Sequence, residues 1–420
     1  MEKQKTVTGT IDTVWRMESA KLIAGLTRIV HDVGLAEDLA QDALVAALEK
    51  WPESGVPDNP GAWLMGTAKH RAIDSLRRAK LIERKHSELA PTIQAAQEEV
   101  VSELDDAIDD DIGDDLLRLI FMTCHPVLST EARAALTLRL LGGLTTTEIA
   151  RAFLVPEPTI AQRIVRAKKT LAEGKVPFEV PRGEDRDARL SSVLEVVYLI
   201  FNEGYSATAG DDWMRPALCD EAMRLGRILA GLAEDEPEVH GLVSLMEIQA
   251  SRARARVDST GEPVLLMDQD RSKWDGVLIR HGLAALARAE ALGGANGLYV
   301  LQAQIAACHA RARTADATDW HRIASLYAML AALTRSPVVE LNRAVAVSMA
   351  DGPQAGLDIV DAIVAAGSLK SYHLLPSVRG DLLARLGRND EARAEFESAA
   401  ALTQNSREQA MLLSRAASTR

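Results

Sequence analysis

The chain has few of the residues that build disulfide-rich, membrane-spanning or aromatic-lined proteins. Its 420 residues include only three cysteines, and Cys124, Cys219 and Cys308 stand far apart, so neither a disulfide framework nor a CxxC metal site is indicated. Aromatic residues make up only 4%. No apolar run is long enough to cross a bilayer, and the first ten residues lack the apolar core of a secretory signal. We therefore expect a cytoplasmic protein with no membrane partner.

Sequence signatures of enzymes are also missing. The chain contains no GxSxG nucleophile elbow and no HExxH zinc motif. Gly61 and Gly66 have the spacing of a phosphate-binding loop, but Thr67 stands where a lysine is needed. The segment DQDRSKWD opens like a calcium loop, but Lys273 replaces the turn glycine and Ile279 the bidentate glutamate. We expect no enzymatic activity, no cofactor and no bound metal.

Alanine, leucine and charged residues dominate the sequence instead. Apolar residues make up 47% and charged residues 26%, which favours a soluble helical protein. The net charge is −12, yet residues 69–85 hold seven Lys or Arg against two acidic residues, and residues 151–175 hold six against two. These two basic islands indicate nucleic acid as a partner. Between them, residues 98–115 hold ten Asp or Glu and no Lys or Arg, which indicates either a solvated linker or a mimic of nucleic acid that enters a basic channel on a partner.

Residues 145–175 have the pattern of a helix-turn-helix. Thr145 and Glu148 have capping-box spacing, and Pro158 suits the first position of the second helix. An apolar stripe at helical spacing would pack the second helix on the first. Its other side carries side chains that can bond base edges and phosphates, namely Thr159, Gln162, Arg163, Arg166, Lys168 and Lys169. From this segment alone, a helical hairpin with a solvated basic face is the alternative.

Three further helices are predicted before residue 86. Residues 12–32 and 36–51 carry apolar stripes, and Asn59 with Pro60 begins a third helix by the cap and first-turn rule. The second helix has an acidic and amide face that suits a basic protein partner, comprising Glu37, Asp38, Gln41 and Asp42. The third helix and its cap carry candidates for contact with DNA, comprising Asn59, Trp63, Lys69, His70, Arg71, Arg77 and Arg78. A tryptophan here is commonly a core residue, but beside a basic face it can stack on an unpaired base.

Three segments, in the order AEDLAQDALVAALEKW, NPGAWLMGTAKHRAIDSLRR and EARAALTLRLLGGLTTTEIARAFLVPEPTIAQRIVRAKKTL, resemble the two conserved domains of an extracytoplasmic-function (ECF) sigma factor of the sigma-70 family. Such proteins are the promoter-recognition subunits of bacterial RNA polymerase. The resemblance covers roughly residues 12–175. It implies that core RNA polymerase is bound through its beta-prime clamp and beta flap, with Asp38, Gln41 and Asp42 on the clamp.

The same resemblance assigns roles on promoter DNA. The helix of residues 62–78 and the loop before it would recognise and melt the downstream promoter element and capture its bases. The helix of residues 158–171 would read the upstream element in the major groove, and the acidic linker would thread toward the RNA path. This chain departs from the family in having few aromatic residues around the melting loop, so the residues that hold flipped bases are left open.

The chain continues well past the sigma-like region. VPFEVPRGED forms a joint marked by Pro and Gly, and helical stripes then alternate with polar loops. Similar segments follow the sigma domains in a subgroup of these factors that carries a helical extension with tetratricopeptide-like repeats, and NEGY and DQDRSKWD are the most distinctive. We expect these two segments to form a pocket or interface from Asn202, Glu203, Tyr205, Asp268, Asp270, Arg271, Trp274 and Asp275.

A weak repeat marks residues 319–415. Ala355, Ile359 and Ala362 have counterparts 37 positions later (392 − 355), near the tetratricopeptide period of about 34 residues. The counterparts are Ala392, Phe396 and Ala399. Stacked helix pairs of this kind have a concave surface that can hold a peptide or protein segment. An irregular helical bundle is the alternative.

We therefore predict an all-α protein that acts as a sigma factor. Its predicted parts are a region-2-like domain (12–85), an acidic linker (86–114), a region-4-like helix-turn-helix domain (115–175), a helical middle domain (185–290) and tetratricopeptide-like repeats (291–420). It would bind core RNA polymerase and promoter DNA and melt the duplex, while the extension modulates its activity. Two other classes remain: a stand-alone helix-turn-helix regulator with a ligand- or protein-sensing helical domain, and a scaffold in which the basic islands are incidental.

Overall fold

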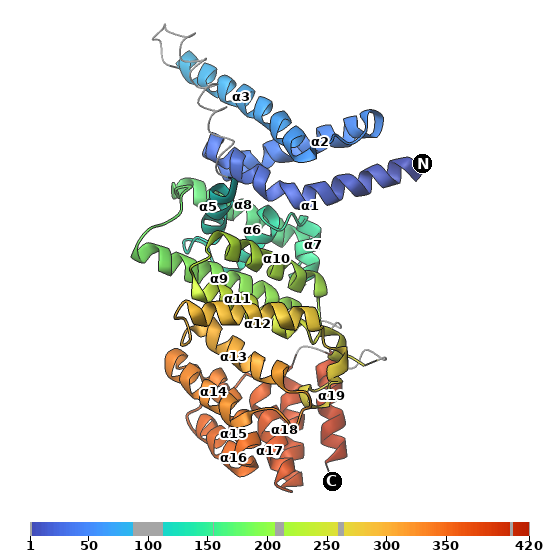
Figure 1. Cartoon of the computed structure of the whole chain (residues 1–420), viewed down its shortest axis with the longest axis vertical. Helices are drawn as coiled ribbons and strands as arrows, with labels where there is room; N and C mark the ends of the chain where they lie inside the picture. Colours follow the sequence, from blue (N-terminus) through green and yellow to red (C-terminus); the bar gives the residue numbers. More distant parts are fainter. Residues whose placement is uncertain are drawn as a thin grey trace. The chain divides into compact units, whose positions relative to one another are not determined.

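A computed structural model describes residues 2–86, 112–153, 155–205, 214–258, 264–403 and 406–419. Over these residues the regular structure consists of α-helices and short 3-10 helices, and it includes no extended strand. The predicted all-α class is confirmed (Figure 1). None of the helices within the described ranges has both the length and the hydropathy that a membrane span needs.

The chain divides into two compact units, Met1–Val197 and Tyr198–Arg420. The helices of the first unit are α1 (Glu2–Val30), α2 (Val33–Ser54), α3 (Pro60–His86), α5 (Ile112–Thr123), α6 (Thr130–Leu140), α7 (Thr146–Phe153), α8 (Glu157–Glu173) and the first part of α9 (Glu184–Tyr205). Most of the predicted acidic linker, residues 87–111, lies outside the described residues.

Helices α1, α2 and α3 pack on one another through an alanine-rich core. Asp32 caps α2 by accepting a hydrogen bond from the backbone N–H of Leu35 at 2.9 Å. The buried face of α2 includes Leu39, Ala43, Ala47 and Trp51. Leu48 belongs to the apolar stripe predicted over residues 36–51, yet it is 43% exposed, because the small residues of α2 rather than its last leucine face α1 and α3.

The second module of this unit consists of α5 to α8, and the beginning of α9 is joined to it by hydrogen bonds. Ser192 donates to the carbonyl of Cys124 at 2.6 Å, and Arg189 donates to the carbonyl of Phe121 at 3.1 Å. Arg133 on α6 donates to Ser192 and, at 3.1 Å, to Glu195. The first residues of α9 are therefore part of the fold of this module.

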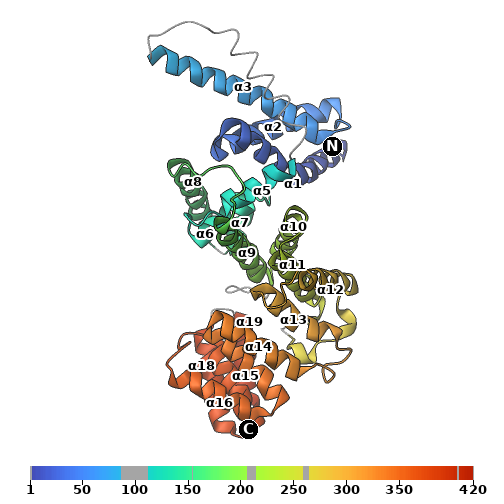
Figure 2. The same ribbon diagram turned by 60° about the vertical axis from the view of Figure 1, so that its left-hand side comes forward.

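In the second unit each α-helix from α10 to α19 packs against the next one along the chain (Figures 1 and 2). These helices are α10 (Pro216–Leu232), α11 (Pro237–Ala250), α12 (Gly276–Ala291), α13 (Leu298–Arg311), α14 (Trp320–Thr334), α15 (Pro337–Ala350), α16 (Pro353–Ala365), α17 (Leu374–Arg385), α18 (Asn389–Leu402) and α19 (Ser406–Ser418). Three 3-10 turns lie between α11 and α12: η1 (Ala253–Ala255), η2 (Leu266–Asp268) and η3 (Arg271–Lys273).

The pattern of buried residues repeats between α16 and α18, but at an offset of 36 residues rather than the predicted 37. The buried residues of α18 include Ala392, Phe396 and Ala399. The buried residues of α16 that lie 36 positions earlier (392 − 356) are Gly356, Val360 and Ile363. Ala362, which the sequence pairing matched with Ala399, is exposed. The offset of 37 matches alanine with alanine at two of its three positions, and this identity is why it was predicted. The buried residues of the two helices support an offset of 36 instead.

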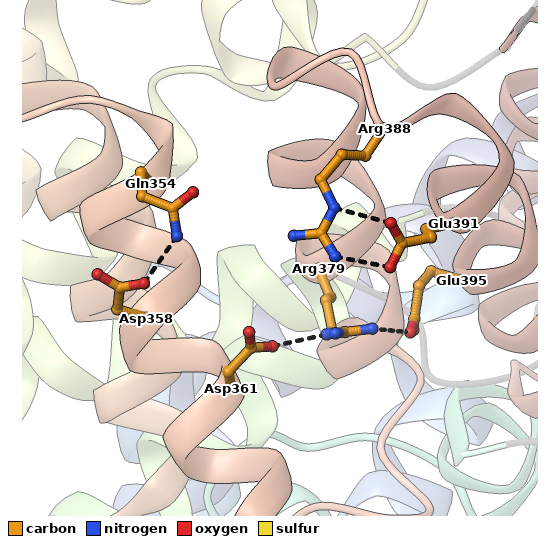
Figure 3. A network of polar contacts seen from close by, with 7 residues as sticks. All are labelled: Gln354, Asp358, Asp361, Arg379, Arg388, Glu391 and Glu395. Carbon is orange, nitrogen blue, oxygen red and sulfur yellow. Dashed lines mark hydrogen bonds and ion pairs between the residues drawn. The ribbon is translucent and has the colours of Figure 1, made fainter.

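Ion pairs also join three consecutive helices of this repeat (Figure 3). Arg379 on α17 donates to Asp361 on α16 at 2.8 Å and to Glu395 on α18 at 2.5 Å. At the start of α18, Arg388 makes two hydrogen bonds to Glu391, at 2.8 and 2.7 Å. Arg379 therefore links α16 to α18, which are not consecutive in the chain.

Gly356 allows α15 and α16 to approach closely, and its replacement tests the packing. A Cβ atom there would lie 2.5 Å from Cβ of Ser348 and 2.7 Å from the carbonyl oxygen of Ala344. We expect Gly356→Ala to lower the free energy of unfolding by about 1 to 3 kcal/mol, because overpacking exceeds the gain in helix propensity. The matched control is Gly231→Ala in α10, where a Cβ would meet open space and about 0.5 to 1 kcal/mol should be gained. Urea unfolding measures both, and a stabilising Gly356→Ala would contradict the packing.

Candidate nucleic-acid interface

The predicted helix-turn-helix is present as α7 and α8, and its cap has the predicted geometry. The backbone N–H of Thr145 donates to the carboxylate of Glu148 at 2.8 Å, and the N–H of Glu148 donates to Oγ1 of Thr145 at 3.1 Å. The predicted apolar stripe of α8 is buried, comprising Ile160, Ile164, Ala167 and Leu171. Helix α8 begins at Glu157, so Pro158 is its second residue rather than its first. Local sequence signals therefore determine this motif.

Four of the six predicted upstream-element residues lie on the exposed face of α8, namely Thr159, Gln162, Arg166 and Lys169. Within the part of the chain that the structure describes, Lys169 forms a solvent-exposed pair with Glu173 at 3.5 Å and no other ion pair, which leaves the lysine available to a phosphate. Arg163 is half-buried and lies near Glu131, whose pKa is lowered first by its own backbone N–H and by Ser129 and to a lesser extent by Arg163. The side chain of Lys168 has a different partner.

Lys168 forms an ion pair with Glu37 of α2, and this contact joins the two modules of the first unit. Glu37 also accepts hydrogen bonds from Nε of Arg139 on α6 and from Nε2 of Gln41, both at 2.6 Å. The Glu37 side chain is only 3% exposed, whereas those of Arg139 and Lys168 are 22% and 21% exposed. We predicted Glu37 on the outward face of its helix, and this was wrong, because two basic side chains from distant segments cover it.

Two more ion pairs reinforce the contact between the modules. Asp115 at the start of α5 is buried and receives Arg28 of α1 at 3.1 Å and Arg118 at 2.8 Å. Arg16 of α1 reaches Glu148 of the capping box at 3.1 Å. Helix α1 therefore contributes to the fold of both modules.

The predicted polymerase-binding residues of α2 lie beside this contact. Asp38 and Asp42 are exposed, and Asp42 pairs with Arg71 of α3 at 3.0 Å. Gln41 is half-buried and bonded to Glu37. The outward charge of the face therefore comes from its two aspartates.

The predicted downstream-element residues lie on α3 and at its N-terminal cap. Asn59 caps the helix by accepting from the N–H of Ala62 at 3.1 Å. The ring of Trp63 packs edge-on against buried Trp51, with 5.3 Å between centroids, so in this conformation it is part of the packing. Lys69 is half-buried, and His70 is exposed, with Nδ1 2.6 Å from the carbonyl oxygen of Gly66. The side chains of Arg77 and Arg78 lie outside the described residues.

The residues of NEGY and DQDRSKWD that we expected to form one pocket or interface have different roles in the structure. Some cap helices, and others belong to a cluster of arginines and aromatic rings. Asp270 caps η3 and Asp275 caps α12, by accepting backbone N–H groups at 2.9 Å and 2.8 Å respectively. Asp268 and Asn202 are exposed, and Glu203 is paired with Arg215. The acidic residues of DQDRSKWD therefore serve mainly as helix caps.

Tyr205, Arg271 and Trp274 meet through two arginines that we did not predict. The guanidinium of Arg256 lies 3.7 Å from the centroid of the Tyr205 ring, and that of Arg271 lies 4.8 Å from the Trp274 ring. The guanidinium of Arg252 lies 5.8 Å from the first ring and 5.9 Å from the second. The sequence signal was the alternating RARARV that follows α11.

Comparison with known proteins divides the chain in a similar way. Residues 15–82 match the model of sigma-70 region 2, residues 118–171 match that of sigma-70 region 4, and residues 189–290 match a family of unknown function, DUF6596. An uncharacterized protein of Rhizobium meliloti, R00370, is 42% identical over 97% of this chain and 95% of its own length. A probable ECF RNA polymerase sigma factor of Mycobacterium tuberculosis, SigI, is 26% identical over 42% of this chain and 59% of its own length. No solved structure matches the chain.

Lys168 and Lys169 are adjacent on α8, but only Lys168 pairs with a residue of the other module. The two lysines therefore allow the contact between the modules to be measured against a matched control. In a double-mutant cycle of Glu37→Gln and Lys168→Met, we expect a coupling energy of about 1 to 3 kcal/mol in the free energy of unfolding, because the carboxylate is shielded from water. The exposed pair of Lys169 and Glu173 is the matched control and should give less than about 0.5 kcal/mol. Equal couplings for the two pairs, measured by urea unfolding, would show that Glu37 does not join the modules.

Proposed function

We infer that this chain, which belongs to the ECF sigma-70 family and carries a helical C-terminal extension with a DUF6596 match, acts as a sigma factor in transcription initiation. The observation that carries the inference is the joint presence of regions 2 and 4, in that order, on α1–α3 and α5–α8. Sigma factors initiate transcription by binding polymerase and DNA rather than by catalysis. Core RNA polymerase and promoter DNA follow as partners.

We propose that α8 reads the upstream promoter element. Its exposed Gln162 and Arg166 can bond base edges in the major groove, while Lys169 and Thr159 can contact phosphates. Phosphate contacts would position the helix, and base contacts would select the sequence. This division is supported by the apolar stripe of α8, which leaves only one face for DNA.

The downstream element is proposed to bind α3 and the loop before it. Lys69, His70 and Arg71 follow one another along the helix, and Arg77 and Arg78 continue the basic sequence. For Trp63 to stack on a flipped base, its ring must leave Trp51, so capture of the base would exchange one aromatic contact for another. The acidic linker would follow the path of the RNA.

We propose that polymerase binding opens the first unit. Asp38 and Asp42 would dock on the beta-prime clamp, and the region-4-like module would reach the beta flap. Lys168 is engaged with Glu37, so it becomes available only when α2 and α8 separate. The free chain would then bind promoter DNA weakly until polymerase separates the modules.

The extension is proposed to modulate this activity. Its helices from α13 to α19 resemble tetratricopeptide repeats in their helix-by-helix packing and in the 36-residue offset (392 − 356), so they offer a surface for a peptide or protein segment. The main alternative remains a stand-alone regulator whose helical domain senses a ligand. Such a regulator would bind its DNA without polymerase, whereas a sigma factor requires it.

Promoter selection is expected to depend on the exposed face of α8. The double change Gln162→Ala and Arg166→Ala should lower transcription from the promoters that the wild-type chain selects by about 10-fold or more, because each lost base contact costs about 1 to 3 kcal/mol. Run-off transcription with core RNA polymerase measures this. Arg280→Ala on α12 is the control, because this arginine is exposed on a helix outside the sigma modules. Unchanged transcription would remove α8 from the promoter contact.

Removal of the extension should change the amount of transcript. An increase would mean that the extension inhibits the sigma modules, and a loss would mean that they require it. The cut belongs after Val197, because Arg189 and Ser192 hold α9 onto the helix-turn-helix module. A second cut, after residue 180, should also destabilise that module by about 1 to 3 kcal/mol through the lost buried hydrogen bonds. If the chain ending at Val197 folds and transcribes like the full chain, the extension has no modulating role.

A further inference from the structure

A small cavity in the second unit is lined by apolar and polar side chains, and most of the polar ones have no hydrogen-bond partner among the described residues. It lies among α11, α13, α14 and α15 and has a volume of about 240 Å³. Part of the lining is apolar, with Leu245, Ile305 and Leu330 as examples. The polar groups of the lining are Gln249, Arg252, Gln302, His309, Tyr327 and Asn342.

Arg252 is a cation in this lining without an anion beside it. The lining contains no carboxylate, and within the described ranges Arg252 forms no ion pair. Its Nε is buried and has no hydrogen-bond partner among the described residues, and its guanidinium lies 5.8 Å and 5.9 Å from the centroids of the Tyr205 and Trp274 rings. Arg252 is half-buried, and a partly shielded cation without a counter-ion attracts an anion more strongly than one in bulk water.

The neighbouring groups strengthen the positive potential. Arg271 donates to the carbonyls of His309 and Ala312, at 2.6 and 2.7 Å, and it too has no carboxylate partner among the described residues. Burial, and then the charges of Arg252 and Arg271, lower the pKa of His309 to about 4, so its imidazole is neutral near pH 7. Arg252 and Arg271 therefore both keep their positive charge, and the neutral imidazole of His309 adds none.

Several hydrogen-bonding groups of the cavity are also unused. The side chains of Gln249, Tyr327 and Asn342 make no hydrogen bond within the described structure, and Nδ1 of His309 is buried without a partner. Gln302 differs, because it accepts from the hydroxyl of Tyr198 at 3.1 Å and donates to the carbonyl of Leu298. Burial raises the pKa of Tyr327 to about 12, so its phenol remains a donor. The cavity thus offers a cation, neutral donors and acceptors, and an apolar surface together.

We propose that this cavity binds a small organic carboxylate, with its carboxylate on Arg252 and its apolar part against Leu245, Ile305 and Leu330. The guanidinium fork matches a carboxylate with two parallel hydrogen bonds. A dry cavity of about 150 Å³ accepts benzene, so this larger one accepts an acid of roughly ten non-hydrogen atoms. The apolar part of the lining favours an organic acid over inorganic phosphate. The proposal is independent of whether the chain acts on promoters.

Binding of benzoate to the full-length chain tests the proposal, with benzamide as the neutral molecule of the same shape. Calorimetric titration, or ligand-detected NMR for weak binding, should show benzoate bound more tightly than benzamide. Arg252→Met should weaken benzoate about 10- to 100-fold, as expected for loss of a charge-assisted pair. Arg254→Met is the matched control, since Arg254 is exposed, is not part of the lining and lies two residues away. Circular dichroism checks that each variant is folded.

A second variant keeps the test decisive if Arg252→Met does not fold. Tyr327→Phe removes only the hydroxyl and should weaken benzoate several-fold while leaving the helices intact. The proposal is overturned if wild-type chain binds benzoate no better than these variants, or if benzamide binds equally well. Displacement of benzoate by inorganic phosphate at equal affinity would also overturn the assignment to an organic carboxylate.

Discussion

The first unit depends on one buried carboxylate. Glu37 belongs to the helix that carries the two aspartates proposed to bind polymerase, yet it is covered by Arg139 and Lys168 from the helix-turn-helix module. A buried carboxylate is tolerated only when cations and donors surround it, so the modules are coupled through this group. In this arrangement Lys168, which was predicted to contact DNA, is already paired with Glu37. Binding to polymerase and release of that lysine would then be the same event.

The second unit follows a different constraint, because each of its helices from α10 to α19 packs against the next one along the chain. Gly356 brings α15 and α16 together, and Arg379 links α16 to α18 from outside. Where α11, α13, α14 and α15 meet, the packing leaves a cavity instead, with Arg252 in its lining. A helical unit that contains an arginine without a carboxylate partner in a cavity is the expected form of a module that responds to a small molecule. The extension would then supply the signal to which the sigma modules respond.

Sequence reasoning succeeded where the determining signals are local. The caps of Asn59 and Thr145 and the buried stripe of α8 can be read from spacing alone, and so could be predicted. Glu37 was placed wrongly because its partner Arg139 lies 102 positions away, and no periodic pattern reveals such a pair. Arg252 was overlooked for the same reason, since its surroundings come from four helices. The acidic residues of DQDRSKWD suggested a binding site, but two of them, Asp270 and Asp275, cap helices instead.

The central claim is that residues 12–175 direct core RNA polymerase to chosen start sites. The most direct measurement is transcription of genomic DNA by purified core enzyme, with and without the full-length chain, followed by mapping of the RNA 5′ ends. We predict a defined set of start sites that requires both proteins, preceded by shared upstream and downstream elements. A chain that does not associate with core polymerase, or that leaves the start sites unchanged, would contradict the claim.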